Sequence, residues 1–227
     1  MNGSRRISQM RILIINPNTT AAVTAHVVEQ LRAHLDPGAK LLAITAKSGE
    51  PVIATPRAFA IGAEAAVESL GEAMREGWKF DKVLLACFGD PGLEAMKKNT
   101  SVPVVGLAQA CMRYAERTTL PYAVVTAGAA WEAILERRFE QWGASKLFCG
   151  IHVLQGTGLD VFSNPLTAMP AVIKAIDAAR AAGAQRIILG GAVFAGYKTL
   201  LKCADLNTED LLDCVECAAG ALLQSQL

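Results

Sequence analysis

The sequence predicts an α/β fold of two pseudo-symmetric lobes, each a mostly parallel sheet flanked by helices. Short runs of apolar and β-branched residues alternate with longer segments rich in Ala, Leu and Glu. The short runs are apolar throughout, which is typical of parallel strands that helices cover on both faces. Ligands bind such sheets outside the carboxyl ends of the strands, so we expect an active site in the cleft between the lobes.

The predicted strands are the apolar runs 11–16, 39–45, 82–86, 102–106, 122–126, 147–154 and 186–189. The predicted helices between them are 20–35, 57–76, 93–97, 108–118, 130–142, 167–182 and 208–223. Polar residues mark several helix starts, because side-chain oxygens satisfy the free N–H groups of a first turn. Asn18 or Thr19 is expected to cap the first helix, and Asn164 and Asn207 precede two later ones.

The two halves of the chain resemble each other. Residues 11–16 precede a polar turn and a predicted helix, as residues 122–126 do, and the run 81–89 is similar to 185–192. A duplicated lobe explains this likeness, although buried strands of this kind can also look alike without duplication. We expect a flexible leader over 1–10, a first lobe of 11–106 with the C-terminal helix at about 207–227, and a second lobe of 107–206.

Charge and composition exclude several classes of function. The 227 residues carry 22 Lys and Arg against 21 Asp and Glu, so no basic excess exists for a nucleic acid. No apolar run is long enough for a signal-peptide core or a membrane span, which indicates a cytoplasmic protein without a membrane partner. With 6 Cys and 3 His, thiols are the better supplied groups for proton chemistry.

Cys87 is the thiol best placed for chemistry. It ends an apolar run and precedes the glycine-rich turn Phe88-Gly89-Asp90-Pro91-Gly92. Backbone N–H groups of such a turn can hold an anion and lower the pKa of a thiol. The alternative is that Cys87 is a small buried apolar residue.

Other turns at predicted strand ends are candidates for binding a substrate. The turn Asn16-Pro17-Asn18-Thr19-Thr20 offers amide, hydroxyl and backbone donors to a carbonyl or carboxylate, unless it only caps a helix. Thr126 and Ala127 form the matching turn in the second half. Pro51 ends a loop that can edge the cleft, although a turn without any ligand role explains it equally well.

The remaining motifs give weaker signals. Cys214 and Cys217 form a Cys-x-x-Cys without a second pair or clustered His, so we expect no metal. Gly156-Thr157-Gly158 and Gly190-Gly191-Ala192 complete neither a dinucleotide fingerprint nor a Walker A sequence. We therefore expect no nucleotide cofactor.

Several motifs together resemble one known family. They are the turn 14–20 with its Asn-Pro-Asn-Thr, the segment 86–93 with its Cys-Phe-Gly-Asp-Pro-Gly, the segment 103–108, and Leu212-Asp213. In this combination the chain resembles the Asp/Glu/hydantoin racemase superfamily, and within it the hydantoin and allantoin racemase branch. The resemblance covers about residues 11–223. It implies a two-lobed α/β fold, a small-molecule substrate, a homo-oligomer and proton transfer at a carbon next to a carbonyl without a cofactor.

The family's mechanism uses two cysteines on opposite faces of the substrate, and this chain matches only the first. Cys87 stands at the first position, with Phe88, Gly89 and Asp90 after it. At the second position the family pattern Leu-Gly-Cys-Ala reads Leu189-Gly190-Gly191-Ala192, so Gly191 replaces the thiol. The family's glutamate after Val-Gly-Leu-Ala is likewise replaced by Gln109.

The missing thiol leaves three functions open. The first is a racemase or epimerase for a small hydantoin, ureide or amino-acid-like substrate, with Cys203 or a water as substitute acid. The second is a single-thiol decarboxylase or isomerase, similar to the arylmalonate decarboxylases, which keep one cysteine in the second half. The third is a non-catalytic small-molecule binder on a racemase scaffold.

Overall fold

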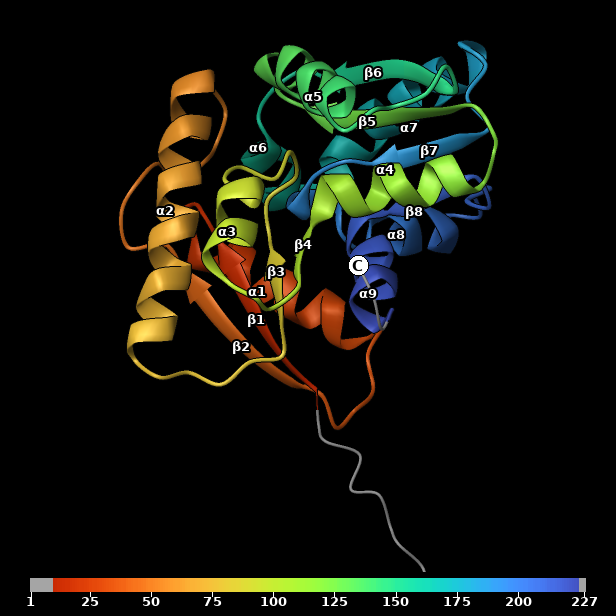
Figure 1. Cartoon of the computed structure of the whole chain (residues 1–227). Coiled ribbons are helices and arrows are strands. Elements are labelled where there is room, and N and C mark those ends of the chain that lie inside the picture. The colour runs from red at the N-terminus through yellow and green to blue at the C-terminus, as the bar shows by residue number, and fades with distance from the viewer. Residues whose placement is uncertain (1–9, 225–227) are drawn as a thin grey trace, which may run out of the picture.

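The computed structural model describes residues 10–224 as two lobes, each with a four-stranded parallel sheet (Figure 1). The first sheet has the order β2-β1-β3-β4 and the second the order β6-β5-β7-β8. The strands of the first sheet are β1 (Arg11–Asn16), β2 (Lys40–Thr45), β3 (Lys82–Leu85) and β4 (Val104–Gly106). Those of the second are β5 (Tyr122–Ala127), β6 (Phe148–Leu154), β7 (Arg186–Leu189) and β8 (Leu211–Asp213). The equal strand orders agree with the predicted pseudo-symmetry.

Helices flank both sheets. Those that follow the strands of the first lobe are α1 (Ala21–Arg32), α2 (Pro56–Arg75), α3 (Leu93–Asn99) and α4 (Leu107–Arg117). Those of the second half are α5 (Ala130–Gln141), α6 (Gly158–Ser163), α7 (Pro165–Ala181), the 3-10 turn η1 (Ala192–Phe194), α8 (Tyr197–Cys203) and α9 (Cys214–Leu223). No helix among residues 10–224 combines the length and the apolar character that crossing a membrane requires.

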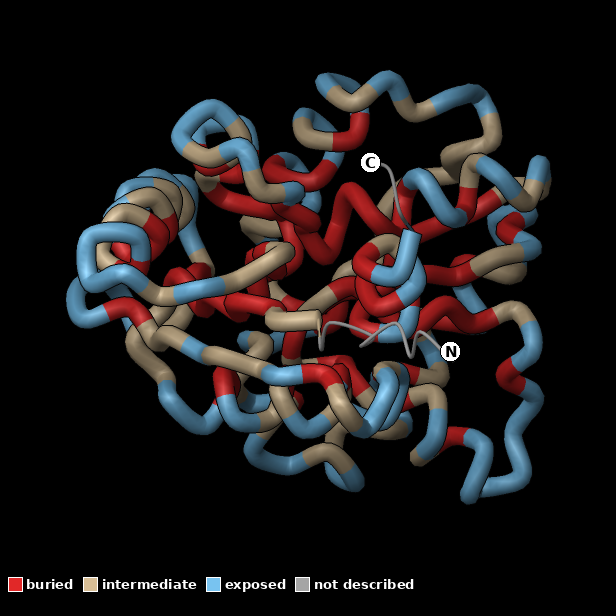
Figure 2. Tube along the Cα trace, turned by 60° about the horizontal axis from the view of Figure 1, so that its bottom comes forward, coloured by how far each residue is buried: buried red, intermediate tan, exposed pale blue. Residues whose placement is uncertain are grey.

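The inner strands β1, β3, β5 and β7 bury both of their faces, which explains their continuous apolar runs, whereas the edge strands β2 and β6 are partly exposed. In β1, Ile12 and Ile14 join a core shared by the two lobes, while Leu13 and Ile15 pack toward α2. In β5, Tyr122 and Val124 face the shared core. Figure 2 shows the buried residues concentrated in the interior of the molecule and the exposed residues around its periphery. The helices α4 and α9 also contribute to this shared core, so the two lobes are packed against each other.

The sequence prediction failed for the segment 208–223, which was expected to be one helix. Leu211–Asp213 forms β8 and pairs with β7, and α9 begins only at Cys214. The side chain of Asp213 accepts hydrogen bonds from the backbone N–H groups of Val215 and Glu216, so it is the helix cap. The strand within 207–227 therefore belongs to the second sheet, although we grouped that segment with the first lobe, while α9 packs on α4 and α1.

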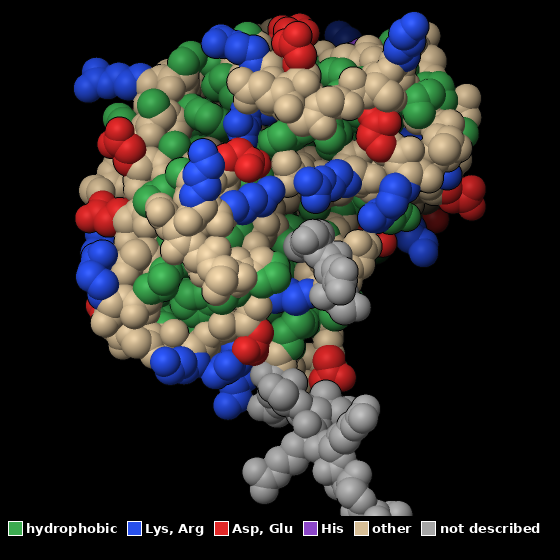
Figure 3. Space-filling view, in the orientation of Figure 1, with side chains coloured by type: hydrophobic (Ala, Val, Ile, Leu, Met, Phe, Trp, Pro, Cys, Tyr) green, Lys and Arg blue, Asp and Glu red, His purple; other side chains and the backbone are tan. Residues whose placement is uncertain are grey.

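Three short elements were also missed, namely α6, η1 and α8. The helix α6 begins with a capping box in which Thr157 and Asp160 satisfy each other's backbone N–H groups. The expected leader lies almost entirely in residues 1–9, outside the described residues. On the face seen in Figure 3, basic and acidic side chains are interspersed, in line with the net charge of +1.

Candidate active site between the two lobes

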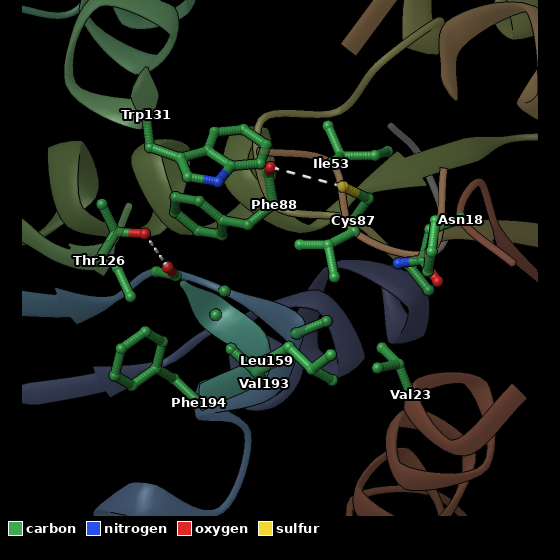
Figure 4. A pocket seen from close by; sticks show the side chains of 18 residues that line it. Asn18, Val23, Ile53, Cys87, Phe88, Thr126, Trp131, Leu159, Val193 and Phe194 are labelled. Atoms are coloured by element: carbon green, nitrogen blue, oxygen red, sulfur yellow. Dashed lines mark hydrogen bonds between the residues drawn. The ribbon is translucent and has the colours of Figure 1, made fainter. Parts of the chain in front are cut away.

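A cavity of about 80 Å³ lies where the carboxyl ends of the strands of both sheets meet (Figure 4). The first lobe contributes residues that follow β1, β2 and β3, and the second lobe contributes residues that follow β5, β6 and β7. The volume exceeds what a single water molecule occupies, so the cavity can hold a small ligand. The lining residues are Asn18, Val23, Pro51, Val52, Ile53, Ala86, Cys87, Phe88, Thr126, Ala127, Trp131, Gly158, Leu159, Gly190, Gly191, Ala192, Val193 and Phe194.

Cys87 lies in the wall that the first lobe provides, two residues beyond the end of β3. Its side chain is 7% exposed and packs with Ile53 and Ala58. The Sγ atom lies 3.7 Å from the carbonyl oxygen of Phe88, as Figure 4 shows. The backbone N–H of Asp90 donates to the carbonyl of Cys87 at 3.1 Å, so a tight turn follows the thiol.

Burial raises the pKa of the Cys87 thiol well above its ordinary value, and the charge of Asp90 raises it further. The sequence-based expectation that the glycine-rich turn lowers this pKa is therefore wrong. Removal of the sulfur from water disfavours the charged form, and no backbone N–H group of the turn offsets that cost. The resting site accordingly holds a neutral thiol, which is a proton donor.

We expect Cys87 to react slowly with iodoacetamide at neutral pH, because only the thiolate attacks and the raised pKa keeps its population small. The rate should rise with pH without reaching a plateau below about pH 10. Peptide mapping by mass spectrometry distinguishes Cys87 from the exposed Cys203. Alkylation of Cys203 serves as the internal control that the reagent is active. A plateau near pH 7 would contradict the raised pKa.

Asp90 lies outside the cavity lining and is fully buried. Its carboxylate accepts hydrogen bonds from the backbone N–H groups of Ala108 at 3.1 Å and Gln109 at 2.7 Å, the first turn of α4. Burial raises the pKa of Asp90 to about 7, while these two bonds and the charges of Arg138 and Lys97 oppose the rise. Asp90 thus ties the Cys87 turn to α4 and does not line the cavity as a substrate ligand would. Gly89 also lies outside the lining.

Asn16 and Asn18 form a small network at the end of β1. The fully buried Asn16 donates through Nδ2 to Asn18 Oδ1 at 2.9 Å and to Thr24 Oγ1 at 2.9 Å. Asn18 Oδ1 also accepts from the backbone N–H of Thr20, so its Nδ2 is turned toward the cavity (Figure 4). Asn16, Pro17 and Thr19 lie outside the lining and shape the turn that presents Asn18.

The second lobe forms the other wall through the predicted residues Thr126, Ala127, Gly190, Gly191 and Ala192. The hydroxyl of Thr126 donates to the carbonyl of Gly190 at 2.7 Å, as drawn in Figure 4. Gly191 stands two residues beyond β7, as Cys87 stands two residues beyond β3, and the two strands hold the same place in their sheets. Topology therefore makes Gly191 the counterpart of Cys87.

The backbone conformation at Gly191 is also unfavourable for a residue with a side chain. Its φ is +156°, and a Cβ atom there would lie 3.0 Å from Cδ2 of Phe194. The Gly191 carbonyl accepts from the backbone N–H of Phe194 at 2.8 Å and from the Cys214 thiol at 3.2 Å. These contacts fix a wall that contains no acid or base of its own.

The sequence did not reveal the apolar part of the lining, which includes Ile53, Trp131, Leu159, Val193 and Phe194. No local pattern distinguishes these residues from core residues, because they meet only when the lobes pack together. Trp131 had a weak signal, since it lies near the start of the helix that follows the Thr126 turn. The lining as a whole is mostly apolar, and its polar groups beside the thiol are the side chains of Asn18 and Thr126 and the indole N–H of Trp131.

None of the other cysteines among residues 10–224 lines the cavity, although the Cys214 thiol contacts the carbonyl of the lining residue Gly191. Cys203, proposed as a substitute acid, is exposed at the end of α8. Cys111, Cys214 and Cys217 are buried where α4 meets α9. Among residues 10–224, no three His, Cys, Asp or Glu side chains gather into a group that could hold a metal.

Comparison with known proteins agrees with this architecture. The sequence profile described as Asp/Glu/hydantoin racemase matches residues 12–222. The chain belongs to the Asp/Glu/hydantoin racemase family. A hydantoin racemase from Paenarthrobacter aurescens is 31% identical over 211 residues, which are 92% of this chain and 88% of that protein.

Solved structures of allantoin racemases share the family fold. The enzyme from Pseudomonas fluorescens has a TM-score of 0.83 at 27% identity, over 93% of this chain and 88% of that one. The enzyme from Klebsiella pneumoniae has a TM-score of 0.80 at 28% identity, over 94% of this chain and 86% of that one. These relatives support the hydantoin and allantoin racemase branch, and the two-lobed fold is confirmed.

Proposed function

We propose that this chain catalyses cofactor-independent proton transfer at a carbon next to a carbonyl, in a small hydantoin, ureide or amino-acid-like substrate. Cys87 carries the proton. The observation that supports this role most is that, among the described residues, Cys87 is the one titratable side chain that lines the cavity. Membership of a racemase family supports the reaction class.

The proposed step moves one proton between carbon and sulfur. The thiolate form of Cys87 takes the proton, the electron pair of the C–H bond passes into the carbonyl, and an enolate forms. The enolate oxygen needs a hydrogen-bond donor, and the Nδ2 group of Asn18 is directed into the cavity. The Cys87 thiol then returns a proton to the same carbon. Because the resting group is a neutral thiol, it must first lose its proton to a water molecule or hydroxide ion from the solvent before it can act as a base.

The missing second thiol makes the proposed transfer one-sided. Inversion needs a proton donor on the far face of the substrate, and the counterpart of Cys87 there is Gly191. Among the lining residues only Thr126 carries a hydroxyl, and this hydroxyl already donates to Gly190. We therefore expect exchange of the α-hydrogen with solvent to be faster than inversion, which depends on a water molecule.

A second candidate is a single-thiol decarboxylase, and the protonation state of Cys87 favours it. In that reaction the bond between the α-carbon and a carboxylate breaks, carbon dioxide leaves, and the electron pair remains on carbon. The neutral thiol then supplies the proton for the new C–H bond, and solvent returns a proton to the sulfur. An apolar lining promotes this step, since it disfavours the charged carboxylate that is lost.

A substrate panel in deuterated water tests these proposals. The panel contains 5-substituted hydantoins, allantoin, aspartate, glutamate and aryl malonates, with Cys87→Ser as the matched variant. Nuclear magnetic resonance follows deuterium at the α-carbon, polarimetry follows inversion, and released carbon dioxide reports decarboxylation. We expect exchange without matching inversion, and exchange by the variant that is about 10²- to 10⁴-fold slower. Binding without any reaction would instead favour a non-catalytic binder, and fast inversion would contradict the one-sided transfer.

The cytoplasmic location and the homo-oligomeric state stay predictions that rest on the sequence and the family.

A further inference from the structure

An arginine of the second lobe holds the turn that follows Cys87 in the first lobe. Arg138 lies in α5, which packs on β6 of the second sheet. Its Nε donates to the carbonyl of Gly89 at 3.2 Å, and its Nη2 donates to the carbonyl of Asp90 at 3.2 Å. The two acceptors are two and three residues beyond the thiol. The guanidinium thus reaches across the cleft to the backbone that carries Cys87.

The same helix touches this turn at a second point. Trp131 precedes Arg138 by seven residues, about two helical turns, so both side chains lie on one face of α5. The Trp131 ring lines the cavity, and a Cβ atom on Gly89 would lie 2.6 Å from its Cζ3 atom. Gly89 is therefore held on its Cα side by Trp131 and at its carbonyl by Arg138.

Arg138 is itself fixed in place. Its guanidinium lies over the ring of Trp142, 4.6 Å from the centroid, and its Nη1 donates to Gln141 Oε1 at 3.1 Å. The side chain is half-buried and lies outside the cavity lining, so it does not touch the substrate. Its bonds to the turn go to main-chain carbonyls and so place the backbone of the turn, while its charge also favours the ionised form of Asp90.

We propose that Arg138 is a positioning residue that couples the packing of the second lobe to the placement of the Cys87 sulfur. The inference rests on the proposed role of Cys87 and adds a residue that acts through it. Without Arg138 the turn loses two hydrogen bonds from a charged donor, and the thiol can shift relative to the cavity. Displacement of a reacting group by about 1 Å can slow a reaction about 100-fold.

The experiment compares Arg138→Met and Arg138→Lys with Arg137→Met in the full chain. Arg137 is the exposed neighbour on the same helix, so its variant controls for loss of one positive charge. The first readout is the iodoacetamide alkylation rate of Cys87, mapped by mass spectrometry, which needs no substrate. The second is kcat and KM for α-hydrogen exchange of a 5-substituted hydantoin in deuterated water. Circular dichroism checks the fold of each variant.

For Arg138→Met we expect kcat to fall about 10- to 100-fold with KM nearly unchanged, and Cys87 alkylation to become several-fold faster as the turn loosens. Arg138→Lys keeps the charge but has a single donor nitrogen in place of the forked guanidinium, so its kcat should lie between those of Arg138→Met and the wild type. Arg137→Met should stay within about 2-fold in both readouts. If Arg138→Met does not fold, Arg138→Lys decides, and unchanged kcat and alkylation in it overturn the inference.

The two readouts separate this inference from the proposed function. If the wild type exchanges no substrate, or if Cys87→Ser remains active, the proposed function fails while the alkylation rates still test the contact between Arg138 and the turn. If alkylation and kcat of Arg138→Met equal those of Arg137→Met, Arg138 does not position Cys87, whatever the substrate is.

Discussion

Replacement of Cys87 by serine should reduce α-hydrogen exchange on an accepted substrate by about 10²- to 10⁴-fold, the usual contribution of a positioned acid or base. Serine retains the size of the side chain, but its hydroxyl is a far weaker acid than a thiol. No other titratable side chain lines the cavity among residues 10–224, so we expect no substitute. Nuclear magnetic resonance in deuterated water measures the rates of wild type and variant on one substrate.

Cys203→Ser is the control for this prediction. Its side chain is exposed at the end of α8, so this variant should exchange substrate at the wild-type rate. Thermal unfolding of both variants shows whether a lost rate reflects a lost fold. Loss of activity in Cys203→Ser with a normal melting temperature would revive Cys203 as the substitute acid and would contradict the single-thiol site.

The sequence predicts those parts of the fold whose burial can be read from the residue pattern of one segment alone. Ile12, Leu13, Ile14 and Ile15 are apolar in succession because β1 is covered on both faces, and this pattern is visible without any partner. The position of Cys87 follows from the same logic. A residue just beyond a parallel strand lies at the carboxyl edge of the sheet, where the cavity forms.

The parts that the sequence does not predict depend on distant segments. A strand of three residues, Leu211–Asp213, has no period that could distinguish it from the first turn of a helix. Its pairing with β7 decides its structure. The direction of the Cys87 pKa was missed for a similar reason, since Ile53 and Ala58 from another segment help to bury the sulfur.

Asp90 illustrates how a motif residue can be assigned the wrong kind of contact. Its place next to Cys87 predicts a substrate ligand, but its left-handed backbone, with φ of +55°, turns the carboxylate toward α4. Gly106, the residue before α4, provides the space, because a Cβ atom there would lie 2.3 Å from the Asp90 carboxylate. A sequence pattern does not contain this contact, since positions 90 and 106 are brought together only by β4.

Asp90→Ala should lower the free energy of unfolding by about 2–4 kcal/mol, because it leaves two buried N–H groups of α4 without an acceptor. An alanine at φ +55° is also strained, and the Asp205→Ala variant measures the cost of this backbone strain alone. Asp205 has φ of +57° but is exposed, so its variant should lose only about 1 kcal/mol. Urea unfolding at pH 8, above the pKa of Asp90 of about 7, measures both losses.

A double-mutant cycle with Gly106→Ala decides whether the carboxylate contact itself causes the loss. In the wild type the added methyl group collides with the Asp90 carboxylate, whose atoms are the three nearest to it. Once Asp90 is alanine, that collision is gone, so Gly106→Ala should cost clearly less in the Asp90→Ala background than in the wild type. If the costs of the two substitutions are additive, the Asp90 carboxylate does not pack against Gly106 at the start of α4. Strong coupling between the two substitutions would instead show that the Asp90 carboxylate lies against the start of α4. Because Asp90 also belongs to the turn that carries Cys87, this contact then supports that turn.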